Sequence, residues 1–342
     1  MKQFDLFGEL ETKLAERASE RATAPPKPAT AQRPARSKNK ARKPRSVWTQ
    51  VPRNPHQTAR TLGENVAHAW HSNFGGSLIE IPIGVVAALT LLREPVPDEA
   101  GLAQWILNLD LEDLPKLYSE IWGVQWAQRP DLIDRARPLH RWLEDEPYDR
   151  QTLLAVRAVT HTAIDAGVFA LTGWDDPDAR SQTDVLSYVL MELRSKSARS
   201  GTGEFHTPAE VCDLLAQVMI DSDSITPGGW IAEPCVGSGG MLRAAAQRLR
   251  DLGCNPHDYK WFGVDIDPIA AACAATNAIV WDLGPQVVIA RGNALSPDMG
   301  LDQALEERAE IIRHRNNVVQ DARWLALFKS VDRLLSSAEE AA

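Results

Sequence analysis

Four short motifs between residues 203 and 293 carry side chains suited to binding a ligand that contains ribose. In chain order they are Gly203-Glu204-Phe205-His206-Thr207-Pro208, Glu233-Pro234-Cys235-Val236-Gly237-Ser238-Gly239-Gly240, Gly263-Val264-Asp265-Ile266-Asp267-Pro268 and Gly292-Asn293-Ala294-Leu295. Gly237 and Gly239 permit backbone torsions and a close backbone approach that a Cβ would prevent. The Asp265 carboxylate can accept hydrogen bonds from two ribose hydroxyl groups.

The last three motifs each follow a short apolar segment that is typical of a buried parallel strand. These segments are Trp230–Glu233, Trp261–Val264 and Val287–Ile289. Residues Met241–Arg250 form a predicted helix, so the glycine turn would aim backbone N–H groups at a ligand. Ligands of such sheets bind at the carboxyl ends of the strands, where all three motifs are expected. A plain strand–helix connection is the alternative for the turn alone, and Leu242 departs from the G-x-G-x-x-G pattern of nicotinamide sites.

Together the four motifs resemble those of the adenine-N6 DNA methyltransferases, especially the modification subunit of type I restriction–modification systems. In that family G-E-F-x-T-P is followed by D-P-A-C-G-S-G-G, by an acidic residue after the second strand, and by G-D. The resemblance covers residues 200–298. It implies an α/β fold with a short parallel Rossmann-like methyltransferase half-sheet, S-adenosyl-L-methionine as the cofactor and DNA as a partner.

The resemblance also implies roles for the matching residues. The aromatic and proline of the first motif would contact the methionine end of the cofactor, the paired glycines would pass beneath it, and Asp265 would hold its ribose. Glu233 and Asn293 stand where the family has Asp, yet both keep an oxygen acceptor, and Asn293 could accept a hydrogen bond from the adenine amino group. The implied cofactor-binding residues are Phe205, Thr207, Pro208, Glu233, Pro234, Gly237, Gly239, Asp265, Ile266 and Asn293.

The catalytic tetrapeptide of that family, N/D-P-P-Y/F, does not occur in the sequence. A flipped adenine needs acceptors for its amino group and an aromatic face to stack on, because these contacts hold the amine in line with the methyl group. The nearest matches lack the second proline and the aromatic residue: Asn54-Pro55-His56, Asp176-Pro177-Asp178 and Asn255-Pro256-His257. No catalytic residue is therefore assigned.

We accordingly expect a DNA-associated, S-adenosyl-L-methionine-binding member of the family that is degenerate or incomplete as a catalyst. Two alternatives remain open. One is a non-catalytic, cofactor-sensing DNA adaptor linked to the replication clamp. The other is one half of a split DNA methyltransferase, whose second subunit brings the missing motif.

The composition is that of an ordinary globular protein, with 44% hydrophobic and 24% charged residues. The longest apolar run, Ile79–Leu92, contains Glu80 and Pro82 and is too short to span a membrane. The N-terminus lacks the apolar region of a secretory signal. The four cysteines form no C-x-x-C pair, so we expect neither a metal site nor disulfides. A cytoplasmic location fits free thiols best.

The first residues resemble the Q-L-S/D-L-F pentapeptide that docks on the bacterial replication sliding clamp. The segment is Gln3-Phe4-Asp5-Leu6-Phe7, with Phe4 in place of Leu. Leu6 and Phe7 would fill an apolar pocket of the clamp, and Gln3 would hydrogen-bond the rim of that pocket. Asp5 matches the third position of the pentapeptide, which is Ser or Asp. The alternative is the first turn of a helix, because the leucines at positions 6, 10 and 14 share a helical face.

Residues 21–63 contain eleven Lys or Arg and no Asp or Glu. Such a segment neutralises phosphates, and its Ala- and Pro-rich part, residues 21–46, has almost nothing to bury. It is expected to be disordered and to contact DNA, with a solubilising spacer as the alternative.

The predicted organisation has five parts. They are an N-terminal peptide (residues 1–20), a basic disordered linker (21–56), a helical domain (57–199), a Rossmann-like cofactor domain (200–300) and a C-terminal amphipathic helix (301–342). The last part is one helix, or two joined at Asn316-Asn317. The outer edge of the first strand would have no partner strand. This helix, the helical domain or another chain would then cover it. The other chain would be a second methyltransferase subunit or a second copy of this one.

Helical spacing of apolar residues predicts six helices before the cofactor motifs: Gln57–Trp70, Asp98–Leu109, Leu111–Trp126, Arg129–Leu143, Arg150–Leu171 and Asp184–Lys196. Their tryptophans are expected in the core rather than in contact with bases: Trp70, Trp105, Trp122, Trp126 and Trp142. Thr207 is expected to cap the helix that follows the first motif, with Pro208 in its first turn.

Overall fold

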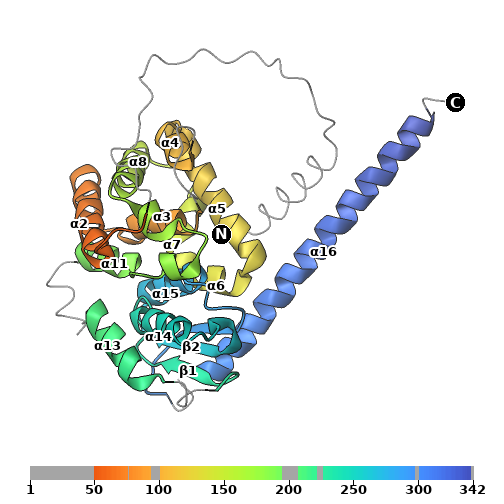
Figure 1. The fold of residues 1–342 in the computed structure, drawn as a ribbon. Coiled ribbons are helices and arrows are strands. Elements are labelled where there is room, and N and C mark those ends of the chain that lie inside the picture. Colours follow the sequence, from red (N-terminus) through yellow and green to blue (C-terminus); the bar gives the residue numbers. More distant parts are fainter. Residues whose placement is uncertain are drawn as a thin grey trace. The chain divides into compact units, whose positions relative to one another are not determined.

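Figure 1 shows the fold of the chain as a computed structural model. The structure describes residues 50–75, 77–93, 101–194, 207–221, 226–296 and 300–339. The chain divides into two units, one of residues 41–308 and one of residues 1–40 with 309–342. Three predictions lie outside the described residues: those on Gln3, Asp5, Leu6 and Phe7, on the basic segment 21–46, and on Phe205.

The predicted parallel half-sheet is present, with its three strands in the order β1-β2-β3. The strands are β1 (Trp230–Glu233), β2 (Lys260–Asp265) and β3 (Val287–Arg291). Helix α14 (Gly240–Asp251) connects β1 to β2, and α15 (Pro268–Val280) connects β2 to β3, as parallel pairing requires. The strands pair in register, so that their carboxyl ends lie at the same edge of the sheet.

The central strand β2 is buried between two layers. On one face, Phe262 and Val264 pack with Val288, Ala290 and the first turns of α16 (Leu301–Glu339), where Ala304 is buried. On the other face lies α15, in which six of the 13 residues are alanines, all of them buried. Small side chains let α15 lie close to the sheet on one side and to helices α6 and α7 on the other.

Helix α16 is a single helix, so the alternative of two helices joined at Asn316-Asn317 is wrong. Its beginning is fixed by ion pairs to α6 (Pro130–Arg135). Arg308 Nε donates to Asp131 Oδ2 at 3.0 Å, and Arg135 Nη2 donates to Glu307 Oε2 at 2.8 Å. These turns of α16 therefore cover a face of the sheet rather than the outer edge of β1.

The all-α region that precedes the sheet is confirmed. Its elements are α2 (Pro55–Asn73), α3 (Glu80–Thr90), α4 (Leu102–Leu107), η1 (Leu111–Asp113), α5 (Leu114–Gln128), α6, α7 (Arg137–His140), η2 (Arg141–Glu144), α8 (Arg150–Asp165), α9 (Val168–Thr172), α10 (Pro177–Arg180) and α11 (Val185–Leu193). After it, α13 (Ala209–Met219) leads towards β1.

Three helix predictions need correction. The expected helix Arg150–Leu171 is interrupted by Gly167, which has φ +94° and separates α8 from α9. The expected helix Arg129–Leu143 is three short elements, in which Pro138 supplies no N–H for a helix hydrogen bond. Helix α3 was not expected, because nearly all of its side chains are buried and it has no amphipathic stripe.

Two side-chain predictions also need correction. Four of the five tryptophans are buried, but Trp105 on the short α4 is 53% exposed. Thr207 does not cap α13, because Pro208 occupies the cap position and no side chain makes a cap hydrogen bond there. The Pro208 carbonyl accepts from the backbone N–H groups of Val211 and Cys212 at 3.0 and 3.1 Å, so the helix begins one residue later than expected.

Within the described ranges, no helix combines the length and apolar character needed to cross a bilayer. No group of three or more His, Cys, Asp or Glu side chains in the same ranges is arranged to hold a metal ion. All four cysteines are free thiols.

Candidate functional site

The glycine turn after β1 has the geometry that its sequence predicts. Gly237 and Gly239 have φ values of +54° and +98°, which residues with a Cβ rarely adopt. The Val236 N–H donates to the Val264 carbonyl at 3.0 Å, and the Gly239 N–H donates to the Val236 carbonyl at 2.7 Å. The turn is therefore anchored to β2 and folds back on itself before α14 begins.

The two glycines differ in what lies beside them. A Cβ at Gly237 would meet no atom within 4 Å, whereas a Cβ at Gly239 would lie 3.0 Å from the Trp281 ring. Gly237 thus leaves open space above a backbone that a flat ligand can approach closely. Gly239 instead provides room for packing between the turn and the indole.

Asp265 joins the second motif to this turn. Its Oδ2 accepts from the Gly237 N–H at 2.8 Å, and its Oδ1 accepts from the Asp267 N–H at 2.9 Å. These bonds fix the carboxylate at the carboxyl end of β2 while leaving each oxygen one further lone pair. The structure therefore brings Asp265 and Gly237 into direct contact across the ends of β1 and β2.

Two exposed apolar side chains flank these polar groups. Ile266 follows β2 and is 74% exposed, and Leu295 follows β3 and is 92% exposed. Between β3 and Leu295 stands Asn293, whose Oδ1 accepts from the Leu295 N–H at 3.0 Å. Exposed apolar groups beside convergent polar groups are typical of ligand sites that bind an aromatic ring.

Glu233 ends β1 and is half-buried, and its Oε1 accepts from the Cys235 N–H at 3.2 Å. Burial raises the pKa of the Glu233 carboxyl, and the hydrogen bond from Cys235 offsets part of that rise. The neighbouring Pro234 is exposed. Glu233 therefore supports the start of the turn by the kind of local hydrogen bond that an Asp at this position would make.

Thr207 and Pro208 lie at the beginning of α13, which packs on α14 through Cys212, Ala216 and Ala244. The Cys212 sulfur would be 3.7 Å from a Cβ on Gly240, the residue that begins α14. The first turn of α13, which contains Cys212, therefore packs against the beginning of α14. The motif residues from Glu233 onward lie at or just after the ends of the three strands, whereas Thr207 and Pro208 lie at the beginning of α13.

Several contacts behind the turn were not predicted from the sequence. Asp184 precedes α11 and accepts a hydrogen bond from Ser238 of the turn, while Arg194 at the end of α11 forms an ion pair with Asp267 before α15. The start of α11 could be predicted, because Asp is a frequent cap. The partners could not, because they are 54 and 73 positions away in sequence.

The three near matches to the catalytic tetrapeptide all begin helices. Asn54, Asp176 and Asn255 are the cap residues of α2, α10 and η3 (Pro256–Asp258), and the proline that follows each is in the first turn. Their side-chain oxygens accept from backbone N–H groups at 3.0, 3.0 and 3.1 Å. The Asn/Asp-Pro pairs thus have a structural explanation.

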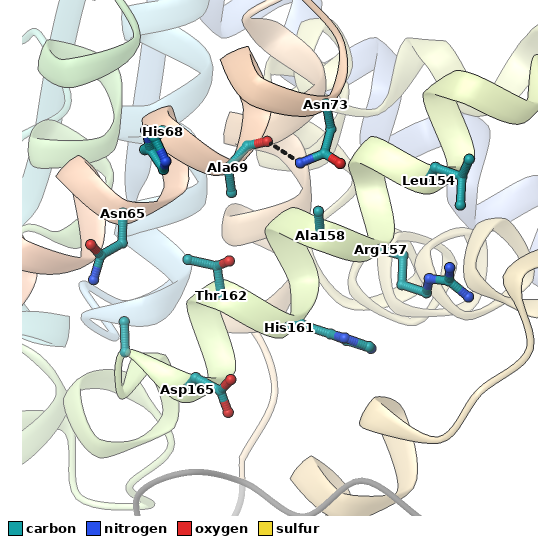
Figure 2. A pocket seen from close by; sticks show the side chains of 11 residues that line it. Asn65, His68, Ala69, Asn73, Leu154, Arg157, Ala158, His161, Thr162 and Asp165 are labelled. Carbon is teal, nitrogen blue, oxygen red and sulfur yellow. Dashed lines mark hydrogen bonds between the residues drawn. The ribbon is translucent and has the colours of Figure 1, made fainter. Parts of the chain in front are cut away.

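A separate groove of about 720 Å³ lies between α2 and α8 in the helical region (Figure 2). It is lined by Asn65, His68, Ala69, Asn73, Leu154, Arg157, Ala158, His161, Thr162, Asp165 and Ala166. It shares no residue with the strand-end motifs. Its amide, hydroxyl and guanidinium groups are of types that contact sugar and phosphate in nucleic-acid complexes, whereas the Asp165 carboxylate would repel a phosphate.

A parallel half-sheet with a glycine turn after β1 and an acidic residue after β2 is a Rossmann-like α/β arrangement. Residues 181–312 match the family model described as N-6 DNA Methylase. This part of the chain is therefore similar to that family.

Two known proteins are similar to the chain. The type I restriction enzyme MjaIX methylase subunit of Methanocaldococcus jannaschii is 28% identical over 96 residues, which are 28% of this chain and 16% of that protein. The solved structure of a type I restriction-modification system methyltransferase subunit from Streptococcus thermophilus has 15% identity and a TM-score of 0.39, covering 71% of this chain and 59% of that one. The chain therefore spans a minor part of the first relative and about three fifths of the second.

Proposed function

We propose that this chain binds S-adenosyl-L-methionine at the carboxyl edge of its sheet and is the cofactor-binding part of an adenine-N6 DNA methyltransferase. The contact between Gly237 and Asp265 carries the proposal. It joins a backbone that a ligand can approach to a carboxylate with free lone pairs, across the ends of two adjacent strands. The family match over residues 181–312 supports the same assignment.

Each motif residue has a distinct task in this proposal. Asp265 accepts from the ribose hydroxyls, Asn293 accepts from the adenine amino group, and Ile266 packs on the ring. Thr207 and Pro208, together with Phe205, hold the methionine end, while Gly237 passes beneath it. The bound cofactor would supply an activated methyl group, and the protein's contribution is to hold that group in one place and orientation.

DNA is the proposed partner. The family named by the matching model acts on DNA, and the groove between α2 and α8 offers Arg157, Asn65 and Thr162 as contacts of the kind that bind a sugar–phosphate backbone. The basic segment 21–46 would add contacts to phosphates that carry no sequence information.

A second candidate function is one half of a split methyltransferase, and the outer edge of the sheet favours it. Among the described residues, β1 pairs with β2 alone, and Trp230 on it is 47% exposed. Helix α13 presents the exposed apolar residues Val211, Leu214 and Val218 at helical spacing. A free parallel edge beside such a stripe can accept a further strand, and a strand from outside these residues could bring the missing acceptors and aromatic face.

The proposal predicts binding without turnover by the isolated chain. Labelled S-adenosyl-L-methionine should crosslink to the purified protein, while duplex DNA rich in adenine should gain no labelled methyl group from it. The reason is that the tetrapeptide with which the family aligns the flipped adenine does not occur in the sequence, and alignment is worth roughly 7–11 kcal/mol. Methyl incorporation that is abolished in Asp265→Ala would show that the chain is a complete enzyme, and absence of crosslinking would refute cofactor binding.

A further inference from the structure

We infer that Asp184 is a positioning residue for the glycine turn, linking the placement of α11 to the backbone that the cofactor approaches. This inference rests on the proposed function. Asp184 belongs to the helical region and lies 54 positions before the turn residue that it contacts. Its side chain is 4% exposed.

Three elements meet at this one carboxylate. Asp184 Oδ2 accepts from the Ser238 hydroxyl of the glycine turn at 2.7 Å. Asp184 Oδ1 accepts from the Ser187 N–H of α11 at 3.0 Å and from Asn277 Nδ2 of α15 at 2.9 Å. Asn277 Nδ2 also donates to the Ser238 carbonyl at 2.8 Å. The Ser238 hydroxyl and carbonyl are therefore both bound to this cluster.

Ser238 stands between Gly237 and Gly239, which both have positive φ. Glycine peptides rotate more freely than others, so a turn with two of them needs outside contacts to keep one conformation. The bond from the Ser238 hydroxyl to Asp184 and the bond from Asn277 to the Ser238 carbonyl provide these contacts. They act beside the bond that the Gly237 N–H donates to Asp265, so consecutive residues of the turn are tied to two carboxylates.

Capping α11 does not by itself explain a buried carboxylate. Asp149 caps α8 in the same way, accepting from the Thr152 N–H at 3.2 Å, and it is exposed. A buried charge is costly unless hydrogen bonds satisfy it, and burial raises the pKa of Asp184 although its hydrogen bonds and Arg243 offset part of the rise. The additional partners of Asp184 are the turn and α15, which both border the proposed cofactor site.

Two variants separate positioning from folding. Ser238→Ala removes the bond to Asp184 Oδ2 and leaves both the cap of α11 and the bond from Asn277 in place. Asp184→Asn keeps the shape of the side chain and an acceptor for Ser187, but it removes the charge and reverses the bond to the turn, because the Ser238 hydroxyl must then accept from an amide N–H instead of donating to a carboxylate. Asp149→Asn is the matched control, because it changes an N-cap carboxylate in the same way at a helix start that does not touch the turn.

The first measurement is the affinity for S-adenosyl-L-methionine by calorimetry, under conditions where urea unfolding shows each variant to be folded. We expect Ser238→Ala to weaken binding on the order of tenfold, because the turn must then be ordered when the cofactor binds and not beforehand. Asp184→Asn should also weaken it, and Asp149→Asn should leave it unchanged.

The second measurement needs no cofactor. In protein labelled with ¹⁵N-glycine, the Gly237 and Gly239 amide signals should shift in Asp184→Asn, which is distant from both glycines in sequence, while the Gly253 signal at the far end of α14 stays in place. If the wild-type protein binds no cofactor, the proposed function fails, and these shifts still test the positioning role. Unchanged Gly237 and Gly239 signals in Asp184→Asn, together with wild-type affinity in both variants, would overturn the inference.

Discussion

Replacing Gly237 with alanine is the sharpest single test of the cofactor site. Gly237 has φ +54°, and an added Cβ would meet no atom of the protein within 4 Å. The methyl group would therefore fill only the space through which the proposed ligand approaches. We expect the variant to fold and to lose most of its affinity for S-adenosyl-L-methionine.

The magnitudes follow from the geometry. Forcing a Cβ into a left-handed conformation costs roughly 1–2 kcal/mol, and removing a glycine from the unfolded chain returns roughly 0.4–1 kcal/mol. The free energy of unfolding should thus fall by about 1 kcal/mol. If the methyl group prevents the close backbone approach, binding should weaken at least tenfold, which corresponds to about 1.4 kcal/mol.

Gly253→Ala is the matched control. Gly253 has φ +75°, also has open space around its Cβ position, and follows the opposite end of α14. It should lose similar stability in a urea titration but keep full affinity in calorimetry. Equal affinities of Gly237→Ala and Gly253→Ala would refute the assignment of the turn. Gly239→Ala is a poorer probe, because its Cβ would press on Trp281.

Two further predictions concern stability and DNA. Burial lowers the pKa of His140 from 6.5 to about 4, so the stability present above pH 6.5 is lost as the pH falls towards 4. Between pH 7 and pH 5 the wild type should therefore lose about 2 kcal/mol more unfolding free energy than His140→Gln, and equal losses in urea titrations would contradict this. Deleting residues 21–46 should weaken DNA binding and make it less dependent on salt. The slope of the logarithm of the binding constant against the logarithm of the salt concentration should become shallower by about 0.9 for each phosphate that this segment neutralises. An unchanged slope in binding titrations at several salt concentrations would mean that the segment is a spacer.

Local patterns in the sequence predicted most of the sheet. The apolar segments at residues 230, 261 and 287 each end in a polar motif, and all three became strands of a parallel sheet. The positive φ of Gly237 and Gly239 also followed from their types. These features depend on short-range periodicity and on the absence of a Cβ, which a sequence displays directly.

The features that the sequence did not predict depend on contacts between residues that are distant in the chain. Helix α3 is surrounded by protein, so it has no amphipathic stripe to indicate a helix. Trp105 is exposed because the helix that carries it spans just Leu102–Leu107 and turns that side outward. Asp184 has the sequence pattern of an ordinary cap, and nothing near it in the chain points to Ser238 or Asn277.

The difference in surroundings between Gly237 and Gly239 could not be predicted from the sequence either. Both glycines serve the same motif in the sequence, but one faces open space and the other faces Trp281, which lies 42 positions later and is fully buried. The sequence could thus indicate that the turn needs glycine. It could not indicate which of the two the ligand would approach.

Calorimetric titration of S-adenosyl-L-methionine into the purified chain, with Asp265→Asn beside it, tests the central claim most directly. Asp265 is the side chain that bonds the glycine turn and has lone pairs left for a ribose. The account predicts saturable binding by the wild type at a single site and a loss of affinity of at least tenfold in the variant, about 1.4 kcal/mol. Absence of binding by the folded wild-type chain, or equal binding by Asp265→Asn, would contradict it.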